Sequence, residues 1–310
     1  MTSTNKETPQ NLKPWQVWLL AARPKTLPAA AAPVIVGSAL AFADGRFRPG
    51  PAAAALLAAL LLQIGANIAN DVFDYYRGAD TVHRVGPLRV TQAGLLTPPQ
   101  VLLGMWITFS LAALLGAYLI AVAGWPVLLV GLSAIIAAIA YTGGPFPFGY
   151  YGLGDLFVFL FFGVAAVCGT YFVQAGQVSA AAAWAAVPMG MLVTAILVVN
   201  NLRDIETDRL AGKQTLAVRL GAGGARLEYL TCLAVAYAVP LVMALGGWVT
   251  FWALLSWLSL PLVVPLVRMI YSETGRPLNR ALAGTGRLAL VFGLFFSLGI
   301  VLPNIVFAGF

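Results

Sequence analysis

The chain has 310 residues, of which 60% are apolar and only 9% are charged. Soluble domains carry about 25% charged residues, and a chain with a mean hydropathy of +0.88 has too little polar surface to cover itself in water. The composition therefore predicts an all-α polytopic membrane protein, and it excludes a disordered chain, a coiled coil, a collagen-like chain, a secreted disulfide scaffold and a nucleic-acid-binding protein.

The uncharged stretches between charged residues predict the membrane helices in chain order. A membrane-spanning helix needs about 20 residues. The stretches 26–43, 49–70 and 288–310 hold one helix each, and the first helix is expected to begin near Trp15. The longer stretches 90–154, 156–202 and 229–267 hold two each, with breaks at 123–126, 174–179 and 246–247. The sequence thus predicts nine transmembrane helices.

Basic residues predict the orientation of these helices, because cytoplasmic loops are enriched in Lys and Arg. With the N-terminus in the cytoplasm, 16 of the 18 basic residues lie on the cytoplasmic side, and only Arg46 and Arg48 lie outside. Residues 1–14 then form a polar cytoplasmic tail, residues 15–310 form a single domain in the lipid bilayer, and the C-terminus lies outside. This bias accounts for the net charge of +7 without an acidic partner.

Acidic residues are scarce, and they gather at the cytoplasmic ends of two predicted helices. Of the eleven, six fall in two groups, namely Asp71, Asp74 and Asp80, and then Asp204, Glu206 and Asp208. Asp71 and Asp74 are three residues apart and Asp204 and Asp208 are four apart, so each pair is expected to share a helix face. Acids near a membrane core are unfavourable and indicate a functional site. The alternative is two solvated helix ends with ordinary salt bridges.

Amide side chains accompany both acidic groups. Asn67 and Asn70 precede the first group, and Asn200 and Asn201 precede the second. An all-oxygen site with few fixed protein ligands suits Mg²⁺, which keeps water molecules and is completed by substrate phosphates. The predicted metal ligands are Asp71, Asp74, Asp80, Asp204 and Asp208.

Basic residues near these acids suit a diphosphate, because proteins hold one with carboxylate-bound Mg²⁺ and surrounding cations. Each of these basic residues could instead serve only to orient the chain in the membrane. The predicted diphosphate-binding residues are Asn67, Asn70, Arg77, Arg84, Arg89, Asn200, Asn201 and Arg203, together with Lys213.

Four blocks of sequence resemble the UbiA superfamily of intramembrane prenyltransferases, in particular its branch that acts on 1,4-dihydroxy-2-naphthoate. The first is Asn70-Asp71-x-x-Asp74 with Asp80, followed by RVGPLR at 84–89. The others are RPKTLP at 23–28, YTGGP at 141–145 with YYGLGD at 150–155, and NNLRDIETD at 200–208 with GKQTLAVRLG at 212–221. The resemblance covers the chain from about residue 15 onward. His83 departs from the pattern, since many relatives carry an acid there.

The resemblance implies a helical bundle around a central cavity that opens to the cytoplasmic face. It implies transfer of a polyprenyl group from an allylic polyprenyl diphosphate to 1,4-dihydroxy-2-naphthoate, with loss of diphosphate and CO₂, to give demethylmenaquinol. Two Mg²⁺ ions would bridge the diphosphate, and a bacterial inner membrane suits such an enzyme. The implied catalytic residues are Asp71, Asp74, Asp204, Asp208 and Lys213.

An anionic acceptor needs a cation near the mouth of the cavity, and Arg23 and Lys25 are candidates for that role. Tyr141, Tyr151 and Asp155 are further candidates for acceptor binding, and aromatic faces in this region can stabilise an allylic cation. Two alternatives remain open. One is a UbiA-type enzyme with another acceptor, such as 4-hydroxybenzoate or homogentisate. The other is a secondary transporter, which is disfavoured because transporters place ionisable residues near the bilayer midplane.

Overall fold

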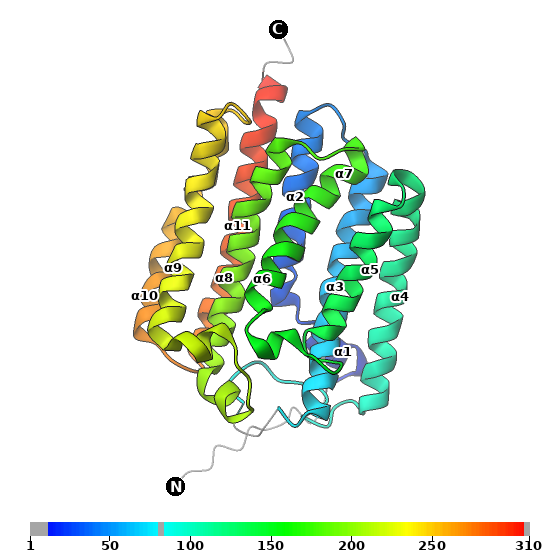
Figure 1. The fold of residues 1–310 in the computed structure, drawn as a ribbon, viewed down its shortest axis with the longest axis vertical. Helices are drawn as coiled ribbons and strands as arrows, with labels where there is room; N and C mark the ends of the chain where they lie inside the picture. Colours follow the sequence, from blue (N-terminus) through cyan, green and yellow to red (C-terminus); the bar gives the residue numbers. More distant parts are fainter. Residues whose placement is uncertain (1–11, 80–83, 307–310) are drawn as a thin grey trace.

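The structure is a computed structural model that describes residues 12–79 and 84–306, and all regular elements in those ranges are helical. Figure 1 shows the long helices running roughly parallel in one bundle. The elements are α1 (Pro14–Ala22), η1 (Pro24–Thr26), α2 (Pro28–Ala43), α3 (Pro49–Tyr76), α4 (Pro98–Ala123), α5 (Pro126–Ala140), η2 (Phe148–Tyr151), α6 (Gly154–Val158), η3 (Phe159–Cys168), α7 (Gly169–Ala175), α8 (Ala180–Leu210), α9 (Leu216–Leu245), η4 (Phe251–Ser259), α10 (Leu260–Ser272) and α11 (Leu278–Val306).

Seven helical segments of the described chain are long and apolar enough to cross a membrane. They are α3, α4, the continuous segment Gly154–Ala175, α8, α9, the segment Phe251–Ser272 and α11. The α1–η1 segment and α2 make an eighth candidate, bent by 54°. The multi-pass prediction is therefore confirmed. The predicted count of nine is not reached by these criteria, because α5 has only 15 residues.

The predicted breaks between paired helices are confirmed. The α4 helix ends at Ala123, where Gly124 has a positive φ of 86°, and Pro126 begins α5. The α7 helix ends at Ala175, where Gly176 has a φ of 78°. Glycine adopts such angles without a steric penalty and proline is favoured in the first turn, so these residues end one helix and begin the next.

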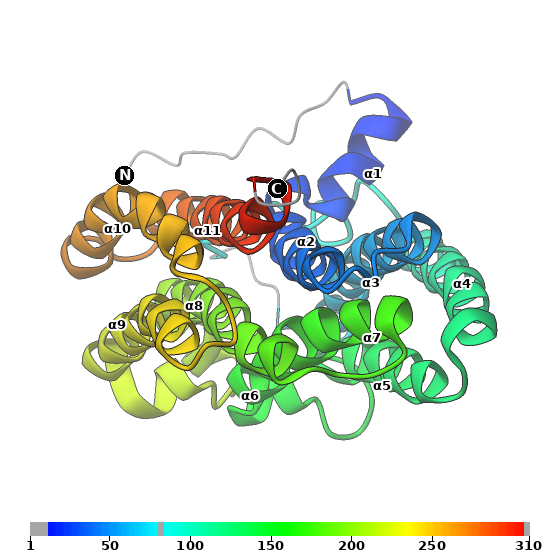
Figure 2. The same ribbon diagram turned by 90° about the horizontal axis from the view of Figure 1, so that it is seen from above.

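The helices form two facing rows when the bundle is seen from above (Figure 2). One row contains α10, α11, α2, α3 and α4, and the other contains α9, α8, the α6–α7 segment and α5. The largest apolar core fills the half of the bundle around α8, α9, α11 and α2, with Met189, Tyr229, Phe292 and Phe296 fully buried. The other half, around α3, α4 and α5, contains two smaller buried clusters.

Both acid-bearing helix ends lie at the same end of the bundle, as the sequence predicted, because α3 and α8 both finish there (Figure 1). Arg46 and Arg48 follow α2 at the opposite end, where α11 finishes. There, the Asn304 Nδ2 donates a hydrogen bond to the Ala43 carbonyl at 2.7 Å. The structure thus separates these two arginines from the acids by the length of the bundle.

Candidate active site

A cavity of about 840 Å³ lies between α2, α3, α4, α5 and the α6–α7 segment. Its volume is within the range of small-molecule sites. One end is polar and contains Asp74, Asp204, Asp208 and Lys213, whereas the rest is lined mainly by apolar side chains. A ligand with an anionic head and a long apolar tail has the chemistry to match both parts.

The α3 helix contributes one polar face to this end. Asn67, Asn70 and Asp74 are separated by three and four residues, so they lie on the same face and all line the cavity. The Asp74 side chain forms an ion pair with Arg89 and lies 3.4 Å from the Lys213 Nζ. It also accepts a hydrogen bond from the Tyr150 hydroxyl at 2.6 Å. Asp74 is thus a buried carboxylate surrounded by donors.

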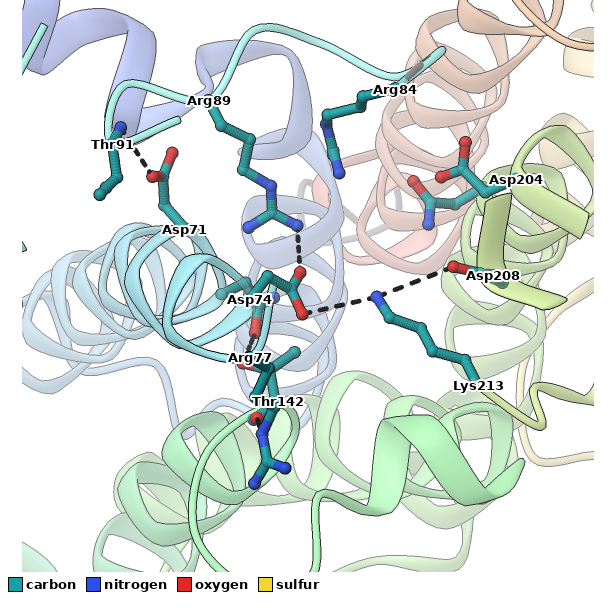
Figure 3. Close-up of polar contacts among 12 residues, drawn as sticks. Asp71, Asp74, Arg77, Arg84, Arg89, Thr91, Thr142, Asp204, Asp208 and Lys213 are labelled. Carbon is teal, nitrogen blue, oxygen red and sulfur yellow. Dashed lines mark hydrogen bonds and ion pairs between the residues drawn. The ribbon is translucent and has the colours of Figure 1, made fainter. Parts of the chain in front are cut away.

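Asp71 does not line the cavity with Asp74. Its two carboxylate oxygens accept hydrogen bonds from the backbone amides of Val90 and Thr91, both at 3.0 Å. Figure 3 shows Asp71 directed to the loop at Thr91, while Asp74 is directed to Arg89 and Lys213. Asp71 lies about 60° around the helix from Asp74, and the backbone amides of Val90 and Thr91 direct its carboxylate away from the cavity.

The α8 helix contributes the opposite polar face. Arg203 binds Asp204 through two hydrogen bonds, of 2.8 Å from Nε and 2.5 Å from Nη2, and its Nη2 also donates to the Asn200 Oδ1 at 2.8 Å. Asp208 lies 3.7 Å from the Lys213 Nζ. Lys213 therefore bridges Asp208 of α8 and Asp74 of α3 (Figure 3).

The loop that contains Arg84 and Arg89 covers the polar end. A Cβ at Gly86 would lie 2.9 Å from the Arg203 Nη2 and 3.1 Å from the Arg84 Nη2, so the two guanidinium groups meet over this glycine. Asn279 of α11 fixes the loop, because its Nδ2 donates to the Val85 carbonyl at 3.0 Å. Its Oδ1 accepts a hydrogen bond from the Arg203 Nη1 at 2.8 Å. Asn279 could not be identified from the sequence, because no local motif surrounds it.

Aromatic residues form the wall beside the acids. Tyr141, Phe148 and Tyr150 line the cavity. The Lys213 Nζ lies 4.5 Å from the centre of the Tyr150 ring, a cation–π contact. Burial and the adjacent Asp74 carboxylate raise the pKa of the Tyr150 phenol above its usual range. Tyr150 is therefore a neutral hydrogen-bond donor to Asp74 at physiological pH.

Arg23 lines the cavity from a strained backbone position, with a φ of 51° and a ψ of 68°. This left-handed conformation is rare for residues other than glycine, and such strain is found at functional sites. The segment is held by Asn67, whose Nδ2 donates to the Ala22 carbonyl at 3.0 Å and to the Thr26 Oγ1 at 2.9 Å. Asn67 thus positions Arg23 as well as lining the cavity.

The structure brings most of the predicted site residues together. Those that line the cavity are Arg23, Asn67, Asn70, Asp74, Arg84, Arg89, Tyr141, Asn200, Asn201, Arg203, Asp204, Asp208 and Lys213. Asp80, and likewise His83, lies outside the described residues. The predicted residues that lie elsewhere are Lys25, Asp71, Arg77, Tyr151 and Asp155.

Contacts explain why several of these residues lie apart from the cavity. The Arg77 Nε donates to the Thr142 carbonyl at 2.9 Å, so Arg77 fastens the turn after α5 to the end of α3. Tyr151 stacks on Phe146 with ring centres 4.3 Å apart, and both rings are exposed. Lys25 is exposed, and Asp155 lies in the first turn of α6.

The carboxylates of the described residues suit Mg²⁺ binding that a ligand completes. Within residues 12–79 and 84–306, no group of three His, Cys, Asp or Glu side chains is arranged to hold a metal ion by itself. Mg²⁺ commonly binds through one or two carboxylates, with water and substrate phosphates completing the octahedron. Asp74, Asp204 and Asp208 on facing helices fit that mode, and the cations that accompany them suit the phosphates.

A cavity among candidate membrane spans, with carboxylates and cations at one end and apolar walls beyond them, has the features expected of an intramembrane prenyltransferase. Residues 30–299 match the UbiA prenyltransferase family, and the chain belongs to that family.

Relatives and solved structures agree with this assignment. The chain is 42% identical to 1,4-dihydroxy-2-naphthoate octaprenyltransferase of Escherichia coli (strain K12) over 305 residues, 96% of this chain and 99% of that protein. It is 41% identical to the Mycobacterium tuberculosis protein of that name over 278 residues, 89% of this chain and 94% of that protein. A UbiA homologue of Aeropyrum pernix K1 has the same fold, with a TM-score of 0.66, 16% identity and coverage of 92% of this chain and 98% of that chain. A UbiA homologue of Archaeoglobus fulgidus bound to DMAPP and Mg²⁺ gives a TM-score of 0.63 at 18% identity. The match covers 92% of this chain and 98% of that chain.

Proposed function

We propose that this protein transfers a polyprenyl group from an allylic polyprenyl diphosphate to 1,4-dihydroxy-2-naphthoate, with loss of diphosphate and CO₂. The product is demethylmenaquinol, a precursor of menaquinone. The observation that carries this proposal is the junction of the acidic and basic cluster with a long apolar cavity. The identity of 42% and 41% to relatives named for this reaction supports the choice of acceptor over 4-hydroxybenzoate or homogentisate.

The polar end of the cavity binds the diphosphate. Asp74 and Asp208, with Asp204, would hold Mg²⁺ there, and we infer two ions because the carboxylates lie on two facing helices. When bound, Mg²⁺ offsets the negative charge that builds up on the departing diphosphate. An Archaeoglobus fulgidus homologue bound to GPP and Mg²⁺ supports this use of magnesium.

Lys213, Arg84 and Arg89 stabilise the leaving group. As the C–O bond of the donor breaks, the electron pair stays on diphosphate oxygen, and fixed cations beside that oxygen lower the barrier. Lys213 lies within 3.7 Å of carboxylates on both helices and so sits where the diphosphate must lie. Tyr150 donates to Asp74 and keeps that carboxylate oriented.

The apolar wall protects the allylic cation from water. Tyr141 and Phe148 pack edge to face with ring centres 5.4 Å apart, and Phe157 stacks on Phe148 at 4.1 Å. All three rings line the cavity next to the acids. Their π faces attract a cation without offering a nucleophile that would trap it.

Arg23 binds the carboxylate of the acceptor. The ring carbon that bears this carboxylate attacks the allylic cation, a C–C bond forms, and the C–CO₂ bond then breaks so that its electron pair restores the aromatic ring. Arg23 holds the carboxylate in a charge-assisted contact until that step. Its strained backbone, fixed by Asn67, aims it at the cavity.

The finer topology also belongs to this proposal. Counting α2 and α5 as spans gives nine helices, which puts residues 1–14 and the mouth of the site in the cytoplasm and the C-terminus outside a bacterial inner membrane. The separation of Arg46 and Arg48 from the other basic residues supports this orientation. Residues 15–310 then act as one catalytic domain.

The test uses purified protein in detergent with octaprenyl diphosphate and 1,4-dihydroxy-2-naphthoate, in the presence of Mg²⁺ or EDTA. The expected result is an Mg²⁺-dependent product with the mass of the prenylated, decarboxylated ring. Product formed only with 4-hydroxybenzoate or homogentisate would overturn the acceptor. The lack of product with any aromatic acceptor would overturn prenyl transfer as the function.

A further inference from the structure

The cavity extends far beyond the acids. Its lining residues on α3 run from Asp74 to Ala55. These residues are 19 positions apart, which corresponds to about 28 Å of helix at 1.5 Å per residue. This approaches the hydrocarbon thickness of a membrane, about 30 Å. A donor whose diphosphate lies near Asp74 therefore places the far units of its tail beside the distal ends of α4, α5 and α7.

Three glycines occupy the centres of the helix faces that line this distal part. They are Gly116 in α4, Gly131 in α5 and Gly169 at the start of α7. The residues three and four positions before and after each glycine also line the cavity, and those before Gly169 belong to η3, which continues directly into α7. Positions with these spacings share one face of a helix. A side chain at any of the three glycines would therefore point into the cavity.

Helix packing does not account for these glycines. A Cβ at Gly116, Gly131 or Gly169 meets no atom of the described chain within 4 Å. Elsewhere packing does explain glycine, since a Cβ at Gly65 would overlap the Phe109 ring. Glycine inside a helix is less stable than alanine. These three glycines combine the lack of packing contacts with a place in the cavity lining, which points to a use for the open space itself.

These glycines lie well away from the polar end. Thr142 follows α5 and donates a hydrogen bond to the Asn70 Oδ1 at 3.0 Å. The end of α5 therefore lies at the same depth in the bundle as the acidic end of α3. Gly131 is 11 residues before Thr142, or about 16 Å along the helix. Gly169 lies at a similar level, because the next residue in α7 packs against Gly37, nine residues after the start of α2.

We propose that Gly116, Gly131 and Gly169 keep the distal part of the cavity open for the far end of a long polyprenyl tail, and so set the longest donor that the protein accepts. This inference rests on the proposed prenyl transfer. A short donor occupies only the part of the cavity beside the acids. The three glycines therefore affect long donors and leave short ones unchanged.

The test replaces Gly131 or Gly169 by leucine and compares two donors, geranyl diphosphate and octaprenyl diphosphate. Leucine is a good helix former, so the change adds volume without weakening the helix. The matched control is Gly223→Leu in α9, where a Cβ also meets no atom within 4 Å but the residue does not line the cavity. The readout is kcat/KM for each donor with 1,4-dihydroxy-2-naphthoate.

In both cavity variants, kcat/KM with octaprenyl diphosphate should fall by about tenfold or more, while the value with geranyl diphosphate stays within about twofold of the parent protein. The Gly223→Leu control should match the parent with both donors. An equal loss with both donors would overturn the proposal, because the leucine would then be acting on the fold or the polar site. The proposal would also be overturned if the ratio of kcat/KM for octaprenyl diphosphate to that for geranyl diphosphate were the same in the variants and the parent protein.

A binding measurement separates this inference from the proposed reaction. Thermal stabilisation of the protein by each diphosphate, with Mg²⁺ and without acceptor, depends on donor binding alone. Loss of the shift with octaprenyl diphosphate in the cavity variants, with the geranyl shift retained, supports the inference even if the parent protein forms no product with the naphthoate. Equal shifts in parent and variants would overturn it even if the reaction is as proposed.

Discussion

Replacing Lys213 by glutamine tests the central feature of the site, the ammonium group between two helices. Lys213 lies 3.4 Å from Asp74 and 3.7 Å from Asp208, and its side chain is only 14% exposed. Loss of one preorganised donor to developing negative charge costs about 10²–10³-fold in turnover, or about 3–4 kcal/mol. We expect kcat to fall by about that factor, because this cation acts most strongly as the diphosphate leaves. The Mg²⁺ concentration for half-maximal rate should also decrease, since the carboxylates no longer share their charge with an ammonium group.

The assay is the Mg²⁺-dependent formation of prenylated product, with kcat measured at saturating donor and across a magnesium titration. Arg209→Gln is the matched control, because Arg209 lies at the same end of the bundle but forms an exposed pair with Glu206 at 3.3 Å. Exposed pairs of this kind contribute about 0–1 kcal/mol, so the control should keep its activity. A Lys213→Gln protein with kcat close to that of the control would refute the role assigned to this residue, and a higher magnesium requirement would refute the competition between ammonium and metal.

Three further predictions concern the acids and the acceptor. Asp208→Asn should lower kcat by about 10²-fold, because the change removes a charge from the Mg²⁺ site; Glu206→Gln, on the exposed side of the same helix, should be unaffected in the same product assay. Asp71→Asn should act on stability, since one of two buried backbone amides loses its acceptor at a cost of about 1–3 kcal/mol. A lowered midpoint of thermal unfolding in detergent checks this, and an unchanged midpoint with lost magnesium dependence would contradict it. Arg23→Gln should raise KM for the naphthoate and leave KM for the donor unchanged, and equal changes in both constants would argue against carboxylate binding by Arg23.

The sequence predicted the features of this fold that arise from local composition. The breaks near Ala123 and Ala175 follow from glycine and proline, whose backbone preferences act within a few residues. The position of Asp74 and Asp208 at one end of the bundle follows from counting apolar stretches. These properties do not depend on which helices pack together.

Features that depend on tertiary contacts could not be predicted in this way. Asp71 and Asp74 differ by a modest rotation about α3, and only the position of the loop at Val90 determines which of them faces the cavity. Asn279 binds the Val85 carbonyl across 194 residues of sequence, and no periodicity relates the two. The end of α5 at Ala140 could not be predicted either, because the apolar residues up to Tyr141 and beyond are compatible with a longer helix.

The packing of α5 has a consequence for the stability of the protein in a bilayer. None of the residues Pro126–Ala140 is buried, although Gly131, Ala134 and Ala138 line the cavity. One side of this helix therefore faces the cavity. Under the proposed function, the polyprenyl tail of the donor packs against that side and takes the place of a hydrophobic core. An emptied cavity would leave an apolar void, which is unfavourable in a close-packed interior. If the proposed function is correct, we expect an acyl or isoprenoid chain from the membrane to fill the cavity once the product has left, so that the packing of α5 depends on the surrounding lipid.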